Sequence, residues 1–242
     1  PDCVSFGAAA AVDAVKATEI VLKKELESWV AETSTEDIYG GSRVNIGRGA
    51  LGNGGGSYGG WAAEYVQKCG TLVRQKYGTK YNLSIYNYET AARWGTPNVG
   101  VPEELLNFAR QHTIRTVSLV TTYEEVRDSL ANGYAVTIAS NQGFSNIRDS
   151  EGFAEPEGNW AHQMCLVGVD DKGDGCSRER PGVLCVNSWG RWNGGPKRHN
   201  QPDGSFWIDA DVLERYILSK RDSWAYSDYD GFPPKKINTR II

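Results

Sequence analysis

Three residues that lie far apart in the sequence have side chains suited to nucleophilic catalysis. Cys3 opens a run of small and apolar residues that reaches Ala11. A thiol at the start of a helix lies at the positive end of the helix dipole, which favours the reactive thiolate. His162 stands where a polar loop enters the apolar segment Met164 to Val169, and a strand end is a rigid support for a general base. Asn187 ends a later apolar segment, and its amide oxygen can accept a hydrogen bond from a histidine ring N–H.

Each of these residues also has an ordinary structural interpretation. A lone cysteine is most often a small buried hydrophobic residue, a histidine at a strand end can be structural, and asparagine is common in turns. Trp189 follows Asn187 closely and could shield a histidine–asparagine bond from water. The two other histidines are His112, expected at the surface, and His199, expected in a solvated basic turn.

The first helix is the element that must position Cys3. The spacing of the apolar residues Phe6, Ala10, Ala14, Ala17, Val21 and Trp29 predicts a helix from Cys3 to Trp29. Its alanine run allows close packing, which suits a central buried element. Near its end, Glu19, Lys23, Lys24 and Glu27 indicate a more hydrated face.

The elements along the rest of the chain change in type near residue 111. We expect helices from Gly60 or Trp61 to Cys69, with Gly70 as a C-cap glycine, and from Glu103 to Arg110 after Pro102. A capped helix is expected over 123–131. Strands are expected at 114–120, 135–139, 164–169, 183–186, 205–208 and 224–226. Helical elements followed by strands predict an α+β fold in two lobes, a helical lobe over 1–110 and a β-rich lobe over 111–242.

Composition excludes several other classes of function. The 242 residues carry a net charge of −4, which argues against nucleic-acid or membrane-surface partners. No apolar run approaches the roughly 18 residues of a membrane span. Five widely spaced cysteines without CxxC pairs do not indicate a zinc site or a disulfide framework, so we expect mostly reduced thiols. We also expect no metal and no cofactor.

Two glycine-rich segments resemble ligand-binding loops only in their letters. Gly47, Gly49 and Gly52 satisfy GxGxxG, but no strand precedes them and no helix starts at Gly52, so we expect an open loop and not a nucleotide site. The segment Asp170 to Gly175 has the composition of a calcium loop without its ligand spacing, and we expect a hairpin turn there.

Five segments resemble, in the same chain order, those of the papain-like cysteine peptidases. Asn187-Ser188-Trp189-Gly190 matches the family's Asn-Ser-Trp-Gly segment letter for letter. The other four are Cys3-Val4-Ser5-Phe6 with its alanine run, Gly56-Ser57-Tyr58-Gly59-Gly60, Trp160-Ala161-His162 with Val167-Gly168-Val169, and Gly204-Ser205-Phe206-Trp207-Ile208.

The resemblance implies a two-lobed fold, in which an active-site cleft separates the helical lobe from a β-barrel-like lobe. It implies that Cys3 is the nucleophile, His162 the base, Asn187 the residue that orients the base, and Trp189 the cover of that contact. Gly59 and Gly60 would hold a polypeptide substrate in extended form. The implied reaction is hydrolysis of a peptide bond through a thioester.

The chain departs from the family pattern near the nucleophile. The family's oxyanion glutamine lies a few residues upstream, and only Pro1 and Asp2 precede Cys3 here. The Asp2 carboxylate would oppose thiolate formation or cap the helix. Ser57 replaces a cysteine whose disulfide partner would also lie upstream. This favours a divergent bacterial or viral branch of the family, and a reducing compartment or a virion over a lysosomal or secreted location. These departures leave two other functions open: a structural or binding module of a larger assembly, and an amidase or isopeptidase.

Overall fold

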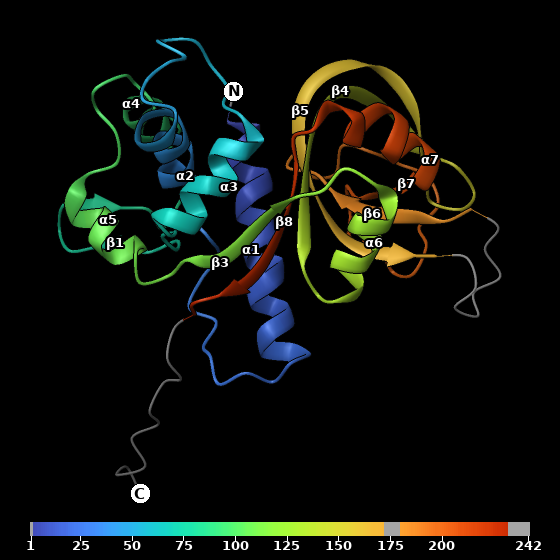
Figure 1. Cartoon of the computed structure of the whole chain (residues 1–242), viewed down its shortest axis with the longest axis horizontal. Helices are drawn as coiled ribbons and strands as arrows, with labels where there is room; N and C mark the ends of the chain where they lie inside the picture. Colours follow the sequence, from blue (N-terminus) through green and yellow to red (C-terminus); the bar gives the residue numbers. More distant parts are fainter. Residues whose placement is uncertain (1, 172–179, 232–242) are drawn as a thin grey trace, which may run out of the picture.

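The computed structural model describes residues 2–171 and 180–231, so most of the turn expected at Asp170 to Gly175 lies outside the described residues. Figure 1 shows α1 (Cys3–Val21) running between a group of short helices and a sheet. The six strands of that sheet pair antiparallel in the order β3-β8-β4-β5-β6-β7. The fold is therefore α+β, as the sequence predicted.

The helical side consists of short elements that follow α1. They are α2 (Glu36–Gly41), a π-helical turn (Ser42–Ile46), α3 (Gly59–Lys68), the small hairpin β1 (Lys76–Tyr77) and β2 (Tyr81–Asn82), α4 (Tyr88–Trp94) and α5 (Glu103–Ala109). The expected helices after residues 59 and 102 are confirmed to within a residue or two, and Gly70 adopts a φ of +80° just after α3. No apolar periodicity had indicated α2 or α4.

The β-rich side contains all the strands of the large sheet. They are β3 (Ile114–Leu119), β4 (Ala135–Arg148), β5 (Ala154–Asp170), β6 (Gly182–Val186), β7 (Phe206–Asp209) and β8 (Ser223–Tyr229). All six expected strands are present, but β4 and β5 extend far beyond the apolar segments that predicted them. Together they form a long, bulged antiparallel hairpin in which Ser140 is opposite His162.

Helical elements also occur between the strands. The helix α6 (Tyr123–Ala131) has the predicted capping box, in which Thr122 and Glu125 satisfy each other's backbone N–H groups. A short α7 (Ala210–Val212) continues through a π turn (Leu213–Ile217) and a 3-10 turn (Leu218–Lys220).

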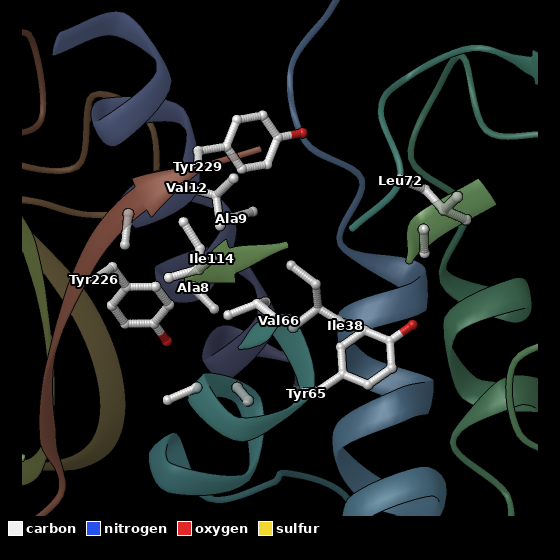
Figure 2. Packing of buried hydrophobic residues seen from close by; sticks show 14 of the residues in the cluster. Ala8, Ala9, Val12, Ile38, Tyr65, Val66, Leu72, Ile114, Tyr226 and Tyr229 are labelled. Carbon is white, nitrogen blue, oxygen red and sulfur yellow. The ribbon is translucent and has the colours of Figure 1, made fainter. Parts of the chain in front are cut away.

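Two hydrophobic cores lie on either side of the sheet strand β5. The first joins α1 to α2, α3 and α5, and Figure 2 shows residues of α1, α3, β3 and β8 packed within it. It also takes in residues from beyond position 111, namely Ile114, Ala135, Cys165, Tyr226 and Tyr229. The second core lies under α6 and the turns after β7. The boundary between 1–110 and 111–242 stays a prediction, because strands of the second half contribute to the first core.

The first helix is shorter than predicted and buries a different face. It ends at Val21 instead of Trp29, and the expected apolar stripe is only partly buried: Ala10 and Ala14 pack at the edge of the first core, whereas Val21 is 66% and Trp29 44% exposed. The buried face instead includes Ala8, Val12 and Glu19. The alanines are uniformly small and apolar, so their periodicity could not distinguish the two faces, and close packing against the sheet selected between them.

Two compositional expectations can be compared with the described residues. Cys3, Cys69, Cys165 and Cys185 are free thiols there, whereas Cys176 lies outside them. No helix of the described chain has both the length and the apolarity that a membrane span needs.

Candidate active site

A cavity of about 380 Å³ brings the predicted nucleophile and base together. Cys3 and His162 both line it, although they are separated by most of the chain. Its other walls come from the glycine-rich segment before α3, from β4 and β5, and from the turn before β8. They are Val4, Gly56, Ser57, Tyr58, Ala139, Ser140, Asn141, Ala161, Gln163, Lys220 and Asp222.

Cys3 is the first residue of α1 and is half-buried. Asp2 occupies the N-cap position, but its side chain makes no cap hydrogen bond to the helix. Its carboxylate instead accepts a hydrogen bond from the Tyr86 hydroxyl, and its backbone carbonyl accepts one from Ser5 Oγ at 2.7 Å. The Asp2 side chain therefore does not provide the helix cap that the sequence made available, because its carboxylate binds Tyr86 instead.

His162 is held in one orientation by two neighbours. Its Nε2 lies 2.8 Å from Asn187 Oδ1, and Trp189 stacks on the ring with 4.4 Å between centroids. Because an amide oxygen is an acceptor, this contact places the ring proton on Nε2 and leaves a lone pair on Nδ1. Trp160 packs on Trp189 at 4.6 Å and extends the aromatic cover.

Burial also sets the charge of this imidazole. His162 is 8% exposed, and its burial lowers its pKa below the usual value, while the hydrogen bond to Asn187 opposes part of that shift. The ring is therefore favoured in its neutral form, which can accept a proton at Nδ1.

The pairing of β5 with β6 explains how His162 meets Asn187. Cys165 is opposite Val186 in this antiparallel pair. His162 precedes Cys165 and Asn187 follows Val186, so both lie at the same end of the paired strands. The apolar segments that border each residue in the sequence are the two strands, and they fix the distance between the side chains.

Gly59 and Gly60, predicted to hold substrate, lie at the N-terminus of α3. Their N–H groups donate to the two carboxylate oxygens of Asp222, at 2.9 and 2.7 Å. Asp222 also accepts from Trp224 Nε1 at 2.8 Å. Substrate binding by these glycines stays a prediction, and it requires either other atoms of the two residues or displacement of Asp222.

The cavity-wall residues that sequence reasoning missed include Asp222 and Gln163. Gln163 is 1% exposed, and its Nε2 donates to the Val4 carbonyl at 3.0 Å, which ties β5 to the start of α1. A Cβ at Gly7 would lie 2.8 Å from Gln163 Cγ, so glycine at this position leaves room for the glutamine. The adjacency of Gln163 to His162 was visible, but no local pattern indicates a contact between residues 159 positions apart.

The remaining histidines lie elsewhere. His112, expected at the surface, is partly exposed; its Nδ1 lies 3.0 Å from the Asp230 carbonyl, and burial lowers its pKa. His199 is in an exposed turn, with Nε2 3.2 Å from the Asp170 carboxylate. Neither lines the cavity. Among the described residues, the group of side chains that could hold a metal ion is at the opposite end of α1.

Sequence comparisons find no match, whereas structural comparison finds proteins of similar fold. No protein-family model and no curated protein matches the chain. The structure of xylellain, a cysteine protease from Xylella fastidiosa, has a TM-score of 0.61 at 17% identity and covers 93% of this chain and 79% of that one. Two structures of Amb a 11, a cysteine protease and major ragweed pollen allergen in its proform, have TM-scores of 0.50 at 15% and 16% identity. They cover 97% and 100% of this chain, which spans 59% and 57% of theirs.

At these identities the likeness concerns the fold alone. It extends over nearly all of this chain. The chain has the fold of the papain-like cysteine peptidases.

Proposed function

We propose that this protein is a cysteine endopeptidase in which Cys3 is the nucleophile. One observation carries the proposal: Cys3 shares a cavity with His162, whose ring is fixed by Asn187 and covered by Trp189. A thiol needs a base that is positioned and protected from water, and a third group that orients that base. The proteins of similar fold that are described as cysteine proteases support the same activity.

The proposed reaction proceeds in two transfers of an acyl group. His162 Nδ1 accepts the thiol proton, and Cys3 Sγ attacks the carbonyl carbon of the peptide bond. The carbon–nitrogen bond breaks as the imidazolium returns its proton to the leaving amine, which leaves a thioester on Cys3. A water molecule, deprotonated by His162, then attacks the thioester and releases the acid and the free thiol.

The Asn187 contact supports this proton cycle. Nε2 donates to the amide oxygen throughout, so the ring keeps one tautomer and one orientation while Nδ1 gains and loses a proton. The amide oxygen also stabilises the imidazolium that forms transiently. Trp189 stacks on the ring and Trp160 packs on Trp189, and the lower polarity of this aromatic surface would strengthen the bond.

Covalent labelling tests the proposal most directly. The intact mass is measured after treatment with a peptidyl epoxide thiol inhibitor at neutral pH, for the native protein and for Cys3→Ala, His162→Ala and Cys69→Ala. We expect one adduct on the native protein and on Cys69→Ala, since Cys69 lies outside the cavity. We expect none on Cys3→Ala, and at least about tenfold slower labelling of His162→Ala.

Peptide libraries then separate peptidase from amidase. Cleavage within peptides, abolished in Cys3→Ala, would support the proposal. A Cys3 adduct with cleavage of isopeptide or terminal amide bonds alone would overturn it in favour of an amidase. A folded native protein that forms no adduct would overturn it in favour of a structural or binding module.

A further inference from the structure

Three glutamates gather at the C-terminal end of α1, away from the cavity that holds Cys3. Glu19 belongs to the helix, and Glu25 and Glu27 follow in the segment after it. One carboxylate oxygen of each lies within 4.8 Å of the corresponding oxygens of the other two. The three line a separate cavity of about 220 Å³. The sequence had indicated a hydrated face here, but Glu19 is 1% exposed.

Only one of the two oxygens of the Glu19 carboxylate accepts a hydrogen bond from a described residue. Its Oε1 accepts from the Tyr229 N–H at 2.9 Å, whereas its Oε2 is buried and has no hydrogen-bond partner among the described residues. A buried, unpaired carboxylate oxygen is destabilising unless a proton or a cation satisfies it. The arrangement therefore demands an additional positive partner at this oxygen.

The basic side chains nearby do not supply that partner. Three basic residues attract the glutamates of the cluster electrostatically. Each of them forms an ion pair with an aspartate that is not part of the cluster. The pairs are Lys16 with Asp13 at 2.9 Å, Lys23 with Asp228 at 3.7 Å, and Arg115 with Asp230 at 3.0 Å. Asp228 and Asp230 also line the cavity, so the acids around it outnumber the bases.

A proton on Glu19 would compete with a cation for the unpaired oxygen Oε2. Burial raises the pKa of Glu19 to about 7, with the negative charges of Glu27 and Glu25 adding to the shift. Burial likewise raises the pKa of Glu27. The carbonyl end of α1 is the negative end of its dipole, which also disfavours an ionised Glu19.

We propose that Glu19, Glu25 and Glu27 form a binding site for a hard divalent cation, with Ca²⁺ the best fit. The donor set is made of carboxylate oxygens alone, which suits Ca²⁺, Mg²⁺ or Mn²⁺ and not the metals that prefer imidazole or thiolate. Ca²⁺ accepts six to eight oxygens in flexible geometry, whereas Mg²⁺ demands a near-ideal octahedron and retains its waters. Three glutamates from a helix end and an irregular segment match the more permissive ion.

The bound cation would fasten three parts of the chain to one another. Glu19 lies on α1 and accepts from the backbone of Tyr229 at the end of β8. Glu27 accepts from the N–H of Gly231, two residues further, at 3.2 Å. Glu25 is tied to Glu19 through its own backbone N–H at 2.9 Å. Binding at this point would stabilise the fold and leave the catalytic cavity unchanged.

Calorimetry and thermal unfolding of the full chain test the site, with CaCl₂ or MgCl₂ as the probe at pH 7 and constant ionic strength. We expect saturable Ca²⁺ binding with a Kd between roughly 10⁻⁵ and 10⁻³ M, at least tenfold weaker for Mg²⁺, and a saturable rise in Tm with Ca²⁺. Titration in two buffers of different ionisation enthalpy should reveal proton release, because the cation displaces the proton of Glu19.

Substitutions identify the ligands. Glu25→Gln should weaken Ca²⁺ binding at least tenfold and should fold normally, since the Glu25 side chain is exposed and makes no hydrogen bond to a described residue. Glu25→Lys should abolish the Ca²⁺ response and raise the Tm measured without Ca²⁺, because the ammonium takes the cation's place. Glu124→Gln, at an exposed position on α6, should bind as the native protein does. An unsaturable Tm response, an equal response to Mg²⁺, or an unchanged Kd in Glu25→Gln would overturn the proposal.

Discussion

The two ends of α1 carry groups that stand in opposite relation to the helix dipole. Cys3 lies at the positive end, half-buried in the cavity that His162 also lines, and the helix dipole there attracts negative charge. Glu19 lies near the negative end, fully buried beside two further carboxylates, where the field and the low dielectric both disfavour an anion. The same helix would therefore support the proposed reactivity of Cys3 at one end and the proposed binding of a proton or a cation at the other.

The two ends of α1 are also anchored to the sheet by different kinds of contact. At the first end, Gln163 of β5 donates to the Val4 carbonyl and its side chain packs over Gly7. At the second end, the carboxylate of Glu19 itself binds the backbone of β8 through Tyr229. An uncharged amide leaves the field around Cys3 undisturbed, whereas a charged group used as an anchor makes the stability of the second end depend on pH.

The largest expected effect concerns the reactivity of Cys3. In His162→Ala we expect the rate of Cys3 alkylation by iodoacetamide at pH 6 to fall about 100-fold, because the thiol loses its proton acceptor. The rate is measured by intact mass over time. The matched control is His199→Ala, which removes a histidine outside the cavity and should leave the rate unchanged. Equal rates in His162→Ala and the native protein would show that the helix dipole alone activates the thiol.

The packing of Gln163 on Gly7 should give the next largest effect. In Gly7→Ala the new Cβ would meet Gln163 Cγ at 2.8 Å and Nε2 at 3.1 Å, and a fully buried side chain has little room to move. We expect a loss of about 1–3 kcal/mol in the free energy of unfolding, measured in urea. In a Gln163→Ala background the same change should be neutral or stabilising, because the space is free and alanine favours helix. A destabilisation that persists in that background would contradict the proposed contact.

The pH dependence of stability should distinguish the second end from the first. The pKa of Glu19 in the folded protein, about 7, exceeds its usual value near 4.5, so the folded state retains a proton that the unfolded state releases. This stabilisation is complete below pH 4.5 and is lost as the pH rises through 7. With a chelator present, we expect the free energy of unfolding to fall by on the order of 2 kcal/mol from this group between pH 5 and pH 8.

The variant Glu19→Gln should remove the part of the pH dependence of the free energy of unfolding that Glu19 causes. The pKa of the buried Asp37 is also raised to about 7 by its burial, so the slope that Asp37 causes should remain in both proteins. Urea unfolding at a series of pH values gives the comparison. If the native protein and Glu19→Gln show the same slope, Glu19 is not protonated on folding.

The smallest expected effect is a test of the dipole itself. Val21 is 66% exposed in the last turn of α1, and Val21→Lys adds a cation at the negative end of the helix. We expect a gain of about 0.3–1 kcal/mol in the free energy of unfolding. Ala17→Lys, exposed one turn earlier, should gain less. A larger gain at position 17 would show that the dipole does not set the difference between the two ends.

Residues close in sequence, or bordered by strong apolar segments, determined much of this protein without its structure. The capping box of α6, the helix after Pro102, the six strand positions and the α+β class all follow from local spacing. The contact of His162 with Asn187 was also within reach, because each residue borders an apolar strand and the two strands pair. These features depend on backbone periodicity and on short-range hydrogen bonds, which the order of residues encodes directly.

Tertiary structure alone decided which face of α1 is buried, where that helix ends, and which side chains complete the cavity. Asp222 reaches the amides of Gly59 and Gly60 across more than 160 positions, and Gln163 reaches Val4 across 159. The sequence predicted a hydrated position for Glu19 near Lys23, but Glu19 is buried where α1 packs against β8. The physical reason is the same in each case, because burial and long-range pairing depend on which surfaces pack together. A run of similar small residues such as Ala8 to Ala11 is compatible with several packing arrangements.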